Sequence, residues 1–178
     1  REETTAVTAG TPWTPQTAAP LGSPLNLNPG PGEITDASGG TYLRGTVGVT
    51  GSPSQATATV TFNFGPAISG TTYSLSAAIP ARAGSDYASG VRYRVFQGTR
   101  FLGEGFLSSQ TGTNAGAFVP PAPNQFVALG TNPITVVFTN TSPDAGDLGK
   151  FIAVDAVRLQ SGGGGGTGTE IAPDPTNY

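Results

Sequence analysis

Hydrophobic and polar residues alternate along most of this chain between Tyr42 and Leu159, with the period of two that is typical of β-strands. The clearest segment is 56–64, where alanine, valine and phenylalanine alternate with Thr57, Thr59, Thr61 and Asn63. Such a pattern places one face against a core and a hydroxyl-rich face toward water. The segment therefore predicts a half-buried antiparallel strand.

Further segments show the same period or are short and β-prone, and glycine- or proline-containing turns separate them. We expect strands over residues 42–50, 56–64, 72–80, 91–97, 100–107, 117–119, 125–129, 134–140 and 151–159. Gly98-Thr99 predicts a hairpin between the fourth and fifth of them. About 8–9 strands without a convincing helix predict an all-β fold, an antiparallel β-sandwich of jelly-roll type.

The last expected strand, Phe151 to Leu159, is the most continuously apolar stretch. Both of its faces are apolar, which predicts a position inside a sheet that is covered on both sides. Asp155 and Arg158 interrupt the two faces. Because a lone buried carboxylate is costly, we expect these residues to make structural polar contacts. Asp155 would either pair with an arginine or accept backbone and hydroxyl donors; the candidate arginines are Arg44, Arg92 and Arg94.

The chain divides into three parts by composition. Residues 1–32 form a Pro/Thr-rich extended arm, residues 33–160 the β-sandwich domain, and residues 161–178 a Gly-rich linker with a short polar tail. Segments 4–9 and 21–27 of the arm are short enough and apolar enough to pair as strands. The arm is either an unstructured tail or a segment that docks on a folded domain through Val7, Trp13, Leu21, Leu25 and Leu27.

Composition excludes several kinds of chemistry. The 178 residues contain no histidine, cysteine or methionine, which removes disulfides, thiol nucleophiles, zinc or copper sites of the usual kind, and histidine acid–base catalysis. With 27 glycines, 16 prolines and only 11% charged residues, the chain is a poor helix former. A net charge of −3 with scattered cationic residues does not favour nucleic acid as a partner.

The same composition predicts a secreted protein, extracellular or at the cell surface, because charge is low, hydroxyl residues are abundant and oxidisable sulfur is absent. No apolar stretch approaches the roughly 20 residues of a membrane span. We therefore expect the chain to begin at a processed end, with a signal peptide already removed.

The candidate sites are few. No spacing among the acidic residues singles out a pair for glycoside hydrolysis, so we do not expect an enzyme. Hard oxygen ligands for a structural calcium ion are offered by Glu33, Asp36, Asp144 and Asp147, which are otherwise ordinary solvated loop acids. We expect no other cofactor. Asn140-Thr141-Ser142 is a glycosylation sequon in a predicted turn.

Four segments together carry a resemblance to a known family: Tyr73–Pro80, Val91–Val95, Gln125–Gly130 and Ile152–Leu159, the last containing Asp155-Ala156-Val157-Arg158. In these segments, residues 33–160 resemble the golvesin C-terminal or xanthan-lyase-like accessory domains. Those domains are galactose-binding-like jelly rolls attached to secreted bacterial proteins and polysaccharide-active enzymes. The resemblance implies a jelly-roll fold, a role next to polysaccharide and, as often in this class, a structural calcium ion.

Two functions of different classes follow. The first is a structural subunit of an extracellular filament or surface assembly, which polymerises by docking its extended arm onto the β-sandwich of an identical neighbouring subunit by strand addition. The alternative is a secreted, non-catalytic carbohydrate-binding accessory module with polysaccharide as its partner.

Overall fold

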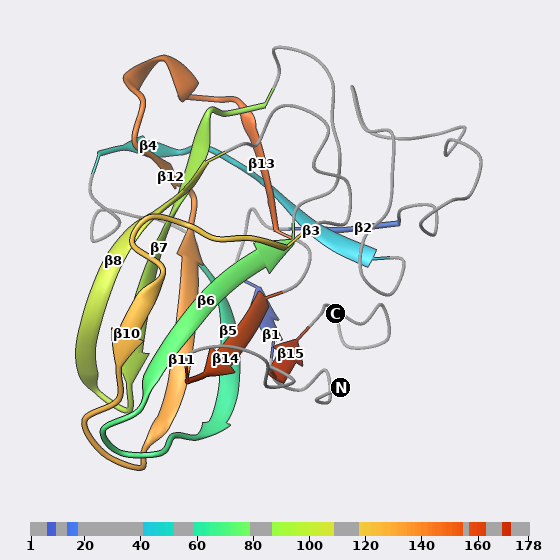
Figure 1. Ribbon diagram of the computed structural model, residues 1–178. Helices are drawn as coiled ribbons and strands as arrows, with labels where there is room; N and C mark the ends of the chain where they lie inside the picture. Colours follow the sequence, from blue (N-terminus) through green and yellow to red (C-terminus); the bar gives the residue numbers. More distant parts are fainter. Residues whose placement is uncertain are drawn as a thin grey trace.

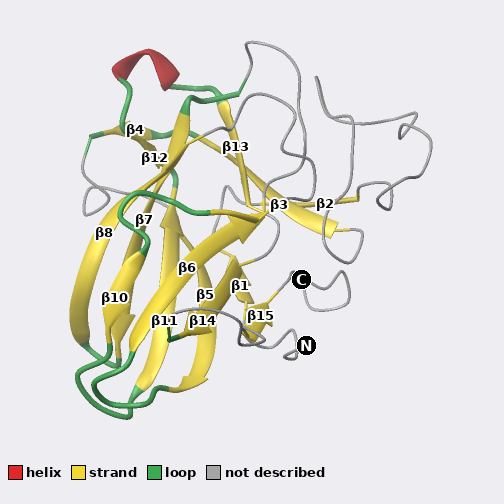
Figure 2. Cartoon of the chain, in the orientation of Figure 1, coloured by secondary structure: helices red, strands yellow, loops and turns green. Residues whose placement is uncertain are grey.

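The computed structural model describes residues 7–9, 14–17, 41–51, 59–78, 87–108, 118–154, 157–162 and 169–171. Most of these residues lie in strands, and their antiparallel sheets pack against each other as a sandwich (Figures 1 and 2). The described part of the chain contains one short 3₁₀ turn, Ala145–Asp147, and no α-helix. The predicted all-β antiparallel sandwich is confirmed.

The first large sheet has the order β1-β5-β11-β7-β8. Neighbouring strands in it are all antiparallel. The strands are β1 (Val7–Ala9), β5 (Thr59–Pro66), β11 (Pro133–Thr139), β7 (Gly90–Gln97) and β8 (Arg100–Ser108). The predicted hairpin is formed by β7 and β8, and Gly98 between them has a φ of 58°, which glycine adopts readily.

The second large sheet has the order β10-β6-β14-β15, and β9 pairs with the far end of β6. It lies across the first sheet in Figure 1. Its strands are β6 (Thr72–Ala78), β9 (Phe118–Val119), β10 (Gln125–Val127), β14 (Val157–Ser161) and β15 (Thr169–Ile171). Strand β15 comes from the Gly-rich tail, so the tail contributes to the sandwich.

Two smaller sheets lie at one end of the sandwich, at the top of Figure 1. One has the order β13-β3-β2, and the other is a parallel pair of β12 and β4. Their strands are β2 (Thr14–Thr17), β3 (Thr41–Thr46), β4 (Val49–Thr50), β12 (Thr141–Ser142) and β13 (Phe151–Val154). Strand β2 was not predicted, because Pro15 lacks a backbone donor and is tolerated only at a sheet edge, where β2 lies.

The core fills the space between the two large sheets. Its largest buried side chains include Phe62, Phe138 and Tyr93 from the first sheet and Leu75 from the second. The rings of Phe62 and Phe138 meet edge to face with their centroids 6.0 Å apart, and Tyr93 lies 5.9 Å from Phe138. Full burial of each such side chain contributes about 1.5–3 kcal/mol, so this layer is the main source of stability.

The stretch Phe151–Leu159 is not one strand, and this prediction was wrong. The structure divides it into β13, which pairs with β3, and β14, which pairs with β6 in the second large sheet. Ile152 and Val154 reach the main core, and so do Val157 and Leu159. The odd spacing between Val154 and Val157 shifts the alternation by one residue, which a continuous strand cannot do without turning its core face outward. The chain changes sheets there.

At Gly105 in β8, the backbone of the first large sheet comes into direct contact with a segment of the second. The backbone of Phe106 pairs with Ala122, from the segment between β9 and β10 of the other sheet, through hydrogen bonds of 3.2 and 3.1 Å. A Cβ on Gly105 would lie 2.2 Å from the Ala122 carbonyl oxygen. The buried Tyr93 hydroxyl donates to the Pro123 carbonyl oxygen, and burial raises the pKa of this phenol above its usual value. The absence of a side chain at Gly105 is therefore what allows the two sheets to join.

Candidate functional site

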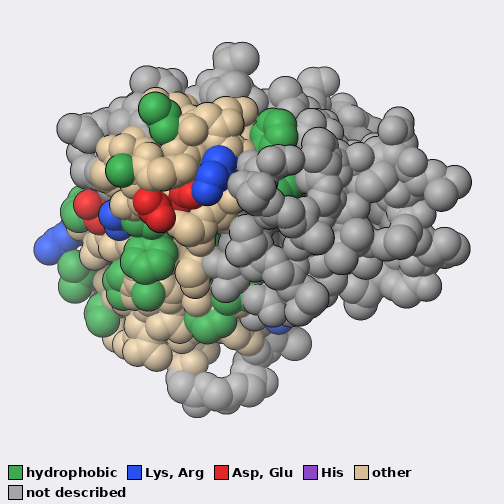
Figure 3. Space-filling model, turned by 90° about the horizontal axis from the view of Figure 1, so that it is seen from above, with side chains coloured by type: hydrophobic (Ala, Val, Ile, Leu, Met, Phe, Trp, Pro, Cys, Tyr) green, Lys and Arg blue, Asp and Glu red, His purple; other side chains and the backbone are tan. Residues whose placement is uncertain are grey.

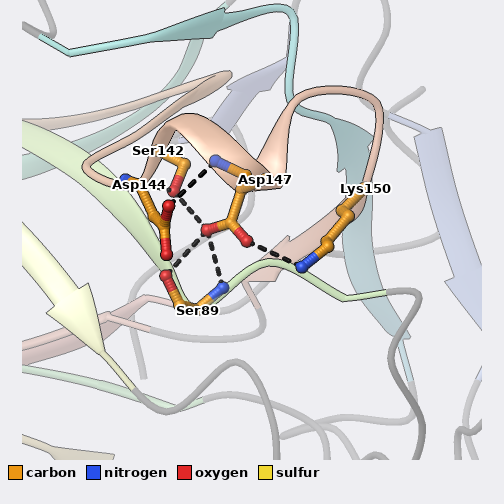
Figure 4. A network of polar contacts seen from close by, with 6 residues as sticks. Ser89, Ser142, Asp144, Asp147 and Lys150 are labelled. Atoms are coloured by element: carbon orange, nitrogen blue, oxygen red, sulfur yellow. Dashed lines mark hydrogen bonds and ion pairs between the residues drawn. The ribbon is translucent and has the colours of Figure 1, made fainter.

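A cluster of polar side chains occupies the end of the sandwich that carries β4 and β12 (Figure 4). Its local frame is the 3₁₀ turn Ala145–Asp147. Asp144 caps this turn, because its Oδ1 accepts a hydrogen bond of 2.8 Å from the Gly146 N–H. The turn directs the Asp147 side chain inward, where it is 1% exposed.

Both oxygens of the Asp147 carboxylate are hydrogen-bonded. Oδ2 accepts from the Ser89 N–H at 2.8 Å, the Ser89 hydroxyl at 2.7 Å and the Ser142 hydroxyl at 2.5 Å. Oδ1 accepts from the Lys150 ammonium at 3.1 Å. Burial by itself would raise the pKa of Asp147, but the donors from Ser142, Ser89 and Lys150 outweigh it and hold the pKa below its usual value. The carboxylate is therefore charged and fully satisfied at neutral pH.

This arrangement bears on the calcium hypothesis. Asp144 and Asp147 lie in the same turn, as their spacing suggested, but Asp147 is bound by four donors, one of them cationic. A calcium ion would have to displace Lys150 to reach it. Glu33 and Asp36 lie outside the described residues, and within the described ranges no group of three or more acidic side chains could hold a metal ion. The calcium site stays a prediction, while the geometry of Asp147 is that of a structural contact.

The other polar residues singled out in the sequence fall in different places. Asn140 is 1% exposed, and the two residues that follow it are also buried. A glycan is bulky and hydrophilic, so a buried side chain is an unfavourable position for one, and glycosylation of Asn140 stays a prediction. Arg158 is half-buried in β14, opposite Ser76 and Glu170. Asp155 lies outside the described residues.

Arginine and phenylalanine side chains cover the outer face of the β7–β8 hairpin. The Arg94 guanidinium lies 4.9 Å from the Phe96 ring centre and 5.1 Å from that of Phe101, and 3.6 Å separate its Nε from Glu104. Phe101 is 47% exposed. Arg92 lies 5.6 Å from the Phe106 ring centre, and its Nε donates to the Gly51 carbonyl oxygen at 3.0 Å. We call this set, Arg92, Arg94, Phe96, Phe101, Glu104 and Phe106, the hairpin face.

The sequence offered Arg92 and Arg94 as candidate partners of Asp155, and it did not reveal the aromatic rings beside them. Part of the signal was present: pairing the two strands across Gly98-Thr99 brings Phe101 opposite Phe96. Glu104 comes opposite Arg94 only through a register shift between Val95 and Phe96, which the turn sequence does not indicate. Asp155, for which both arginines were candidate partners, lies outside the described residues, so that pairing stays a prediction beside the contacts of Arg92 with Gly51 and of Arg94 with Glu104. Seen from above, charged side chains of both signs lie close together among hydrophobic and neutral groups (Figure 3).

Three sheet edges receive strands from the two ends of the chain. In the first large sheet β1 pairs with β5, with Val7 opposite Phe62. In the smaller sheet β2 pairs with β3, and in the second large sheet β15 pairs with β14. Of the arm anchors predicted from sequence, Val7 lies in β1; the others, Trp13, Leu21, Leu25 and Leu27, lie outside the described residues.

Comparisons with protein-family models, curated proteins and solved structures give no match to this chain. The resemblance to golvesin-type accessory domains therefore stays a prediction. Among the described residues, no helix is long and apolar enough to cross a membrane.

Proposed function

We propose that this protein is a structural subunit of an extracellular filament or surface assembly, in which the N-terminal arm of one copy adds strands to the β-sandwich of the next. The observation that carries the proposal is the position of β1, an arm segment paired antiparallel with the edge of β5. That edge of the first sheet therefore accepts a strand from this arm sequence.

The two sides of β5 are paired to different extents. One side is hydrogen-bonded to β11 along the whole strand, so this side is permanently occupied. Along the other side, from Val60 to Phe62, the described strand that pairs with β5 is β1. An edge that lacks such a strand presents unpaired backbone donors and acceptors, which strand addition satisfies. The same backbone contact can form within one chain or between two copies. Between copies, the arm of one copy meets the β5 edge of the next, and because these are two different surfaces the contact is head-to-tail. Head-to-tail contacts of this kind produce a fibre when they do not close into a ring.

Removing the arm is expected to abolish assembly. The full chain should form large particles by light scattering, whereas a protein lacking residues 1–30 should remain a monomer with the circular dichroism of a β-sandwich. A chain that lacks residues 172–178 is the matched control, because it keeps β1, β2 and β15, and it should assemble like the full chain. Polymers of the arm-deleted protein with native-like dichroism would show that the arm is not the joint.

The single tryptophan gives a second readout of the same proposal. Trp13 lies in the arm, so a protein without residues 1–30 contains no tryptophan. A peptide of residues 1–30 should bind this domain, and its Trp13 fluorescence anisotropy should rise without background from the domain. A peptide of the same composition in scrambled order should bind more weakly. Equal binding of the two peptides would contradict addition in a defined register.

The hairpin face favours a second candidate function, carbohydrate binding. Phe101 is half-exposed, and Glu104 and the Arg94 guanidinium lie beside it with charged groups able to hydrogen-bond sugar hydroxyls. An aromatic ring next to such polar groups is a usual arrangement for stacking against the apolar face of a sugar. A polysaccharide would then be the partner.

Under this second candidate, Phe101→Ala should lower affinity for a retaining polysaccharide by roughly threefold to tenfold, the size of one stacking contact. Affinity electrophoresis in polysaccharide gels measures this change. Ile68→Ala is the matched control, since Ile68 is also an exposed hydrophobic residue but belongs to the turn between β5 and β6 and not to the hairpin face. Unretarded migration of the wild-type chain in every gel, together with a silent glycan array, would count against carbohydrate binding.

A further inference from the structure

The two ends of the chain reach their sheet edges through connectors of very different length. Strands β14 and β15 are antiparallel neighbours joined by residues 162–168. Strands β2 and β3 are also antiparallel neighbours, but residues 18–40 join them. Fully extended chain covers at most ~3.3 Å per residue, so the first connector reaches roughly 25 Å and the second roughly 75 Å.

The size of the domain makes this difference decisive. A compact domain of about 130 residues has a radius of gyration of about 14 Å and is therefore roughly 35 Å across. The connector 18–40 can span more than a whole neighbouring domain, whereas the connector 162–168 cannot. Only the arm has the reach to place its strands on another copy while its own sandwich stays intact.

The tail is also held locally. Gly162 follows β14 and has a φ of 75°, a left-handed conformation that begins the chain reversal after this strand. The N–H of this glycine donates to the Thr72 carbonyl oxygen at 3.0 Å, which fixes the start of the turn on β6. The return leads to β15, which also lies close to β5. These contacts make β14 and β15 a hairpin of one chain.

The arm carries two strands that are close together in the sequence. Only residues 10–13 separate β1 from β2, and the two strands pair with β5 and β3, which belong to different sheets. Both receiving strands are held on their other side, β5 by β11 and β3 by β13. The receiving strands β5 and β3 therefore stay in their sheets without the arm. Once one arm strand has docked, the other docks more readily, so the two attachment points strengthen each other.

We propose that the N-terminal arm is the exchanged element and docks on a second copy of this chain at two edges, β1 on β5 and β2 on β3, while the C-terminal strand β15 closes its own sheet. This inference rests on the proposed assembly function and assigns different roles to the two ends. The arm joins copies, and the tail protects the edge of β14 from unwanted pairing.

Mixed single-cysteine variants test the proposal directly, because the chain contains no cysteine. Thr8 and Thr61 are direct partners in the β1–β5 register, and Arg158 and Glu170 are direct partners in the β14–β15 register. Antiparallel partners have Cα atoms about 4.5–5.5 Å apart, which a disulfide can bridge. Chains carrying T8C are mixed with chains carrying T61C, allowed to assemble, and oxidised; R158C and E170C chains are treated in parallel.

A covalent dimer from the T8C and T61C mixture, with none from the R158C and E170C mixture, is the expected result. The double variant R158C/E170C should form its disulfide within one chain and migrate as a monomer on a non-reducing gel. A dimer from the tail mixture, or assembly without a dimer from the arm mixture, overturns the proposed exchange and leaves assembly itself standing. Two results together overturn the assembly function as well: a chain that stays monomeric by light scattering, and a double variant T8C/T61C that forms its disulfide only within one chain.

Discussion

Gly105→Ala is expected to destabilise the protein by about 3 kcal/mol or more, the upper end of the usual cost of overpacking. The new Cβ would lie 2.2 Å from the Ala122 carbonyl oxygen and 2.7 Å from Pro123 Cδ. The oxygen belongs to backbone that is hydrogen-bonded to Phe106, so it cannot move aside without breaking the junction between the sheets. Urea unfolding followed by circular dichroism measures the change.

Two other glycines grade this prediction. A Cβ at Gly103 would meet the side chain of Phe126 at 2.9 Å, which can shift, so Gly103→Ala should cost less than Gly105→Ala. Gly130 has nothing within 4 Å of an added Cβ, and Gly130→Ala should leave the unfolding midpoint nearly unchanged. If Gly105→Ala proves insoluble, the order of Gly103→Ala and Gly130→Ala still tests the packing. Equal stability of all three variants would mean that β8 does not approach the other sheet closely.

Asp147→Ala is expected to destabilise the fold by about 3 kcal/mol, because it leaves the Ser89 N–H and the buried Ser142 hydroxyl without their acceptor. It also removes the partner of Lys150, the only lysine of the chain. Asp144→Ala is the matched control. Asp144 is exposed and caps the same turn through one hydrogen bond, so its loss should cost only about 1 kcal/mol. Urea unfolding at pH 7 compares the two, and an equal cost would show that the buried cluster adds nothing beyond the cap.

The lowered pKa of Asp147 gives this contact a pH dependence. In the unfolded chain its carboxyl has a pKa of about 3.9, and in the folded chain the pKa is lower. The ionised form therefore stabilises the fold fully above about pH 4 and progressively less as the pH falls toward the folded value. The stability difference between wild type and Asp147→Ala should shrink below pH 4 in a series of urea titrations. A difference that stays constant down to pH 2 would contradict the hydrogen-bonded, ionised carboxylate.

Several strands were predictable because their pattern is local. The residues of β5 and β7, and those of the second half of β8, alternate between buried and more exposed positions. In a half-buried antiparallel strand this alternation is visible in the sequence itself. The hairpin of β7 and β8 followed from Gly98-Thr99 for the same reason. Phe151–Leu159 could not be divided in advance, because an apolar run buried on both faces looks alike in one strand or two.

The polar cluster could not be found from the sequence in the same way. Ser89 and Asp147 are 58 positions apart, and nothing local to either residue indicates that they meet. Gly105 likewise reads as an ordinary glycine in a strand until the Ala122 backbone is placed against it. Asp144 and Asp147 were recognised as a pair of acids, but the partners that decide their role come from elsewhere in the chain.

By itself, the sequence determined the β class of this protein, the position of its main strands, and an arm and a tail of distinct composition, because each is a property of neighbouring residues. Only the tertiary structure decided which sheet each strand joins, that β1, β2 and β15 complete sheet edges, and that Asp147 is buried among donors. Those outcomes depend on contacts between distant segments, and their free energies are settled only when the two sheets pack around a common core.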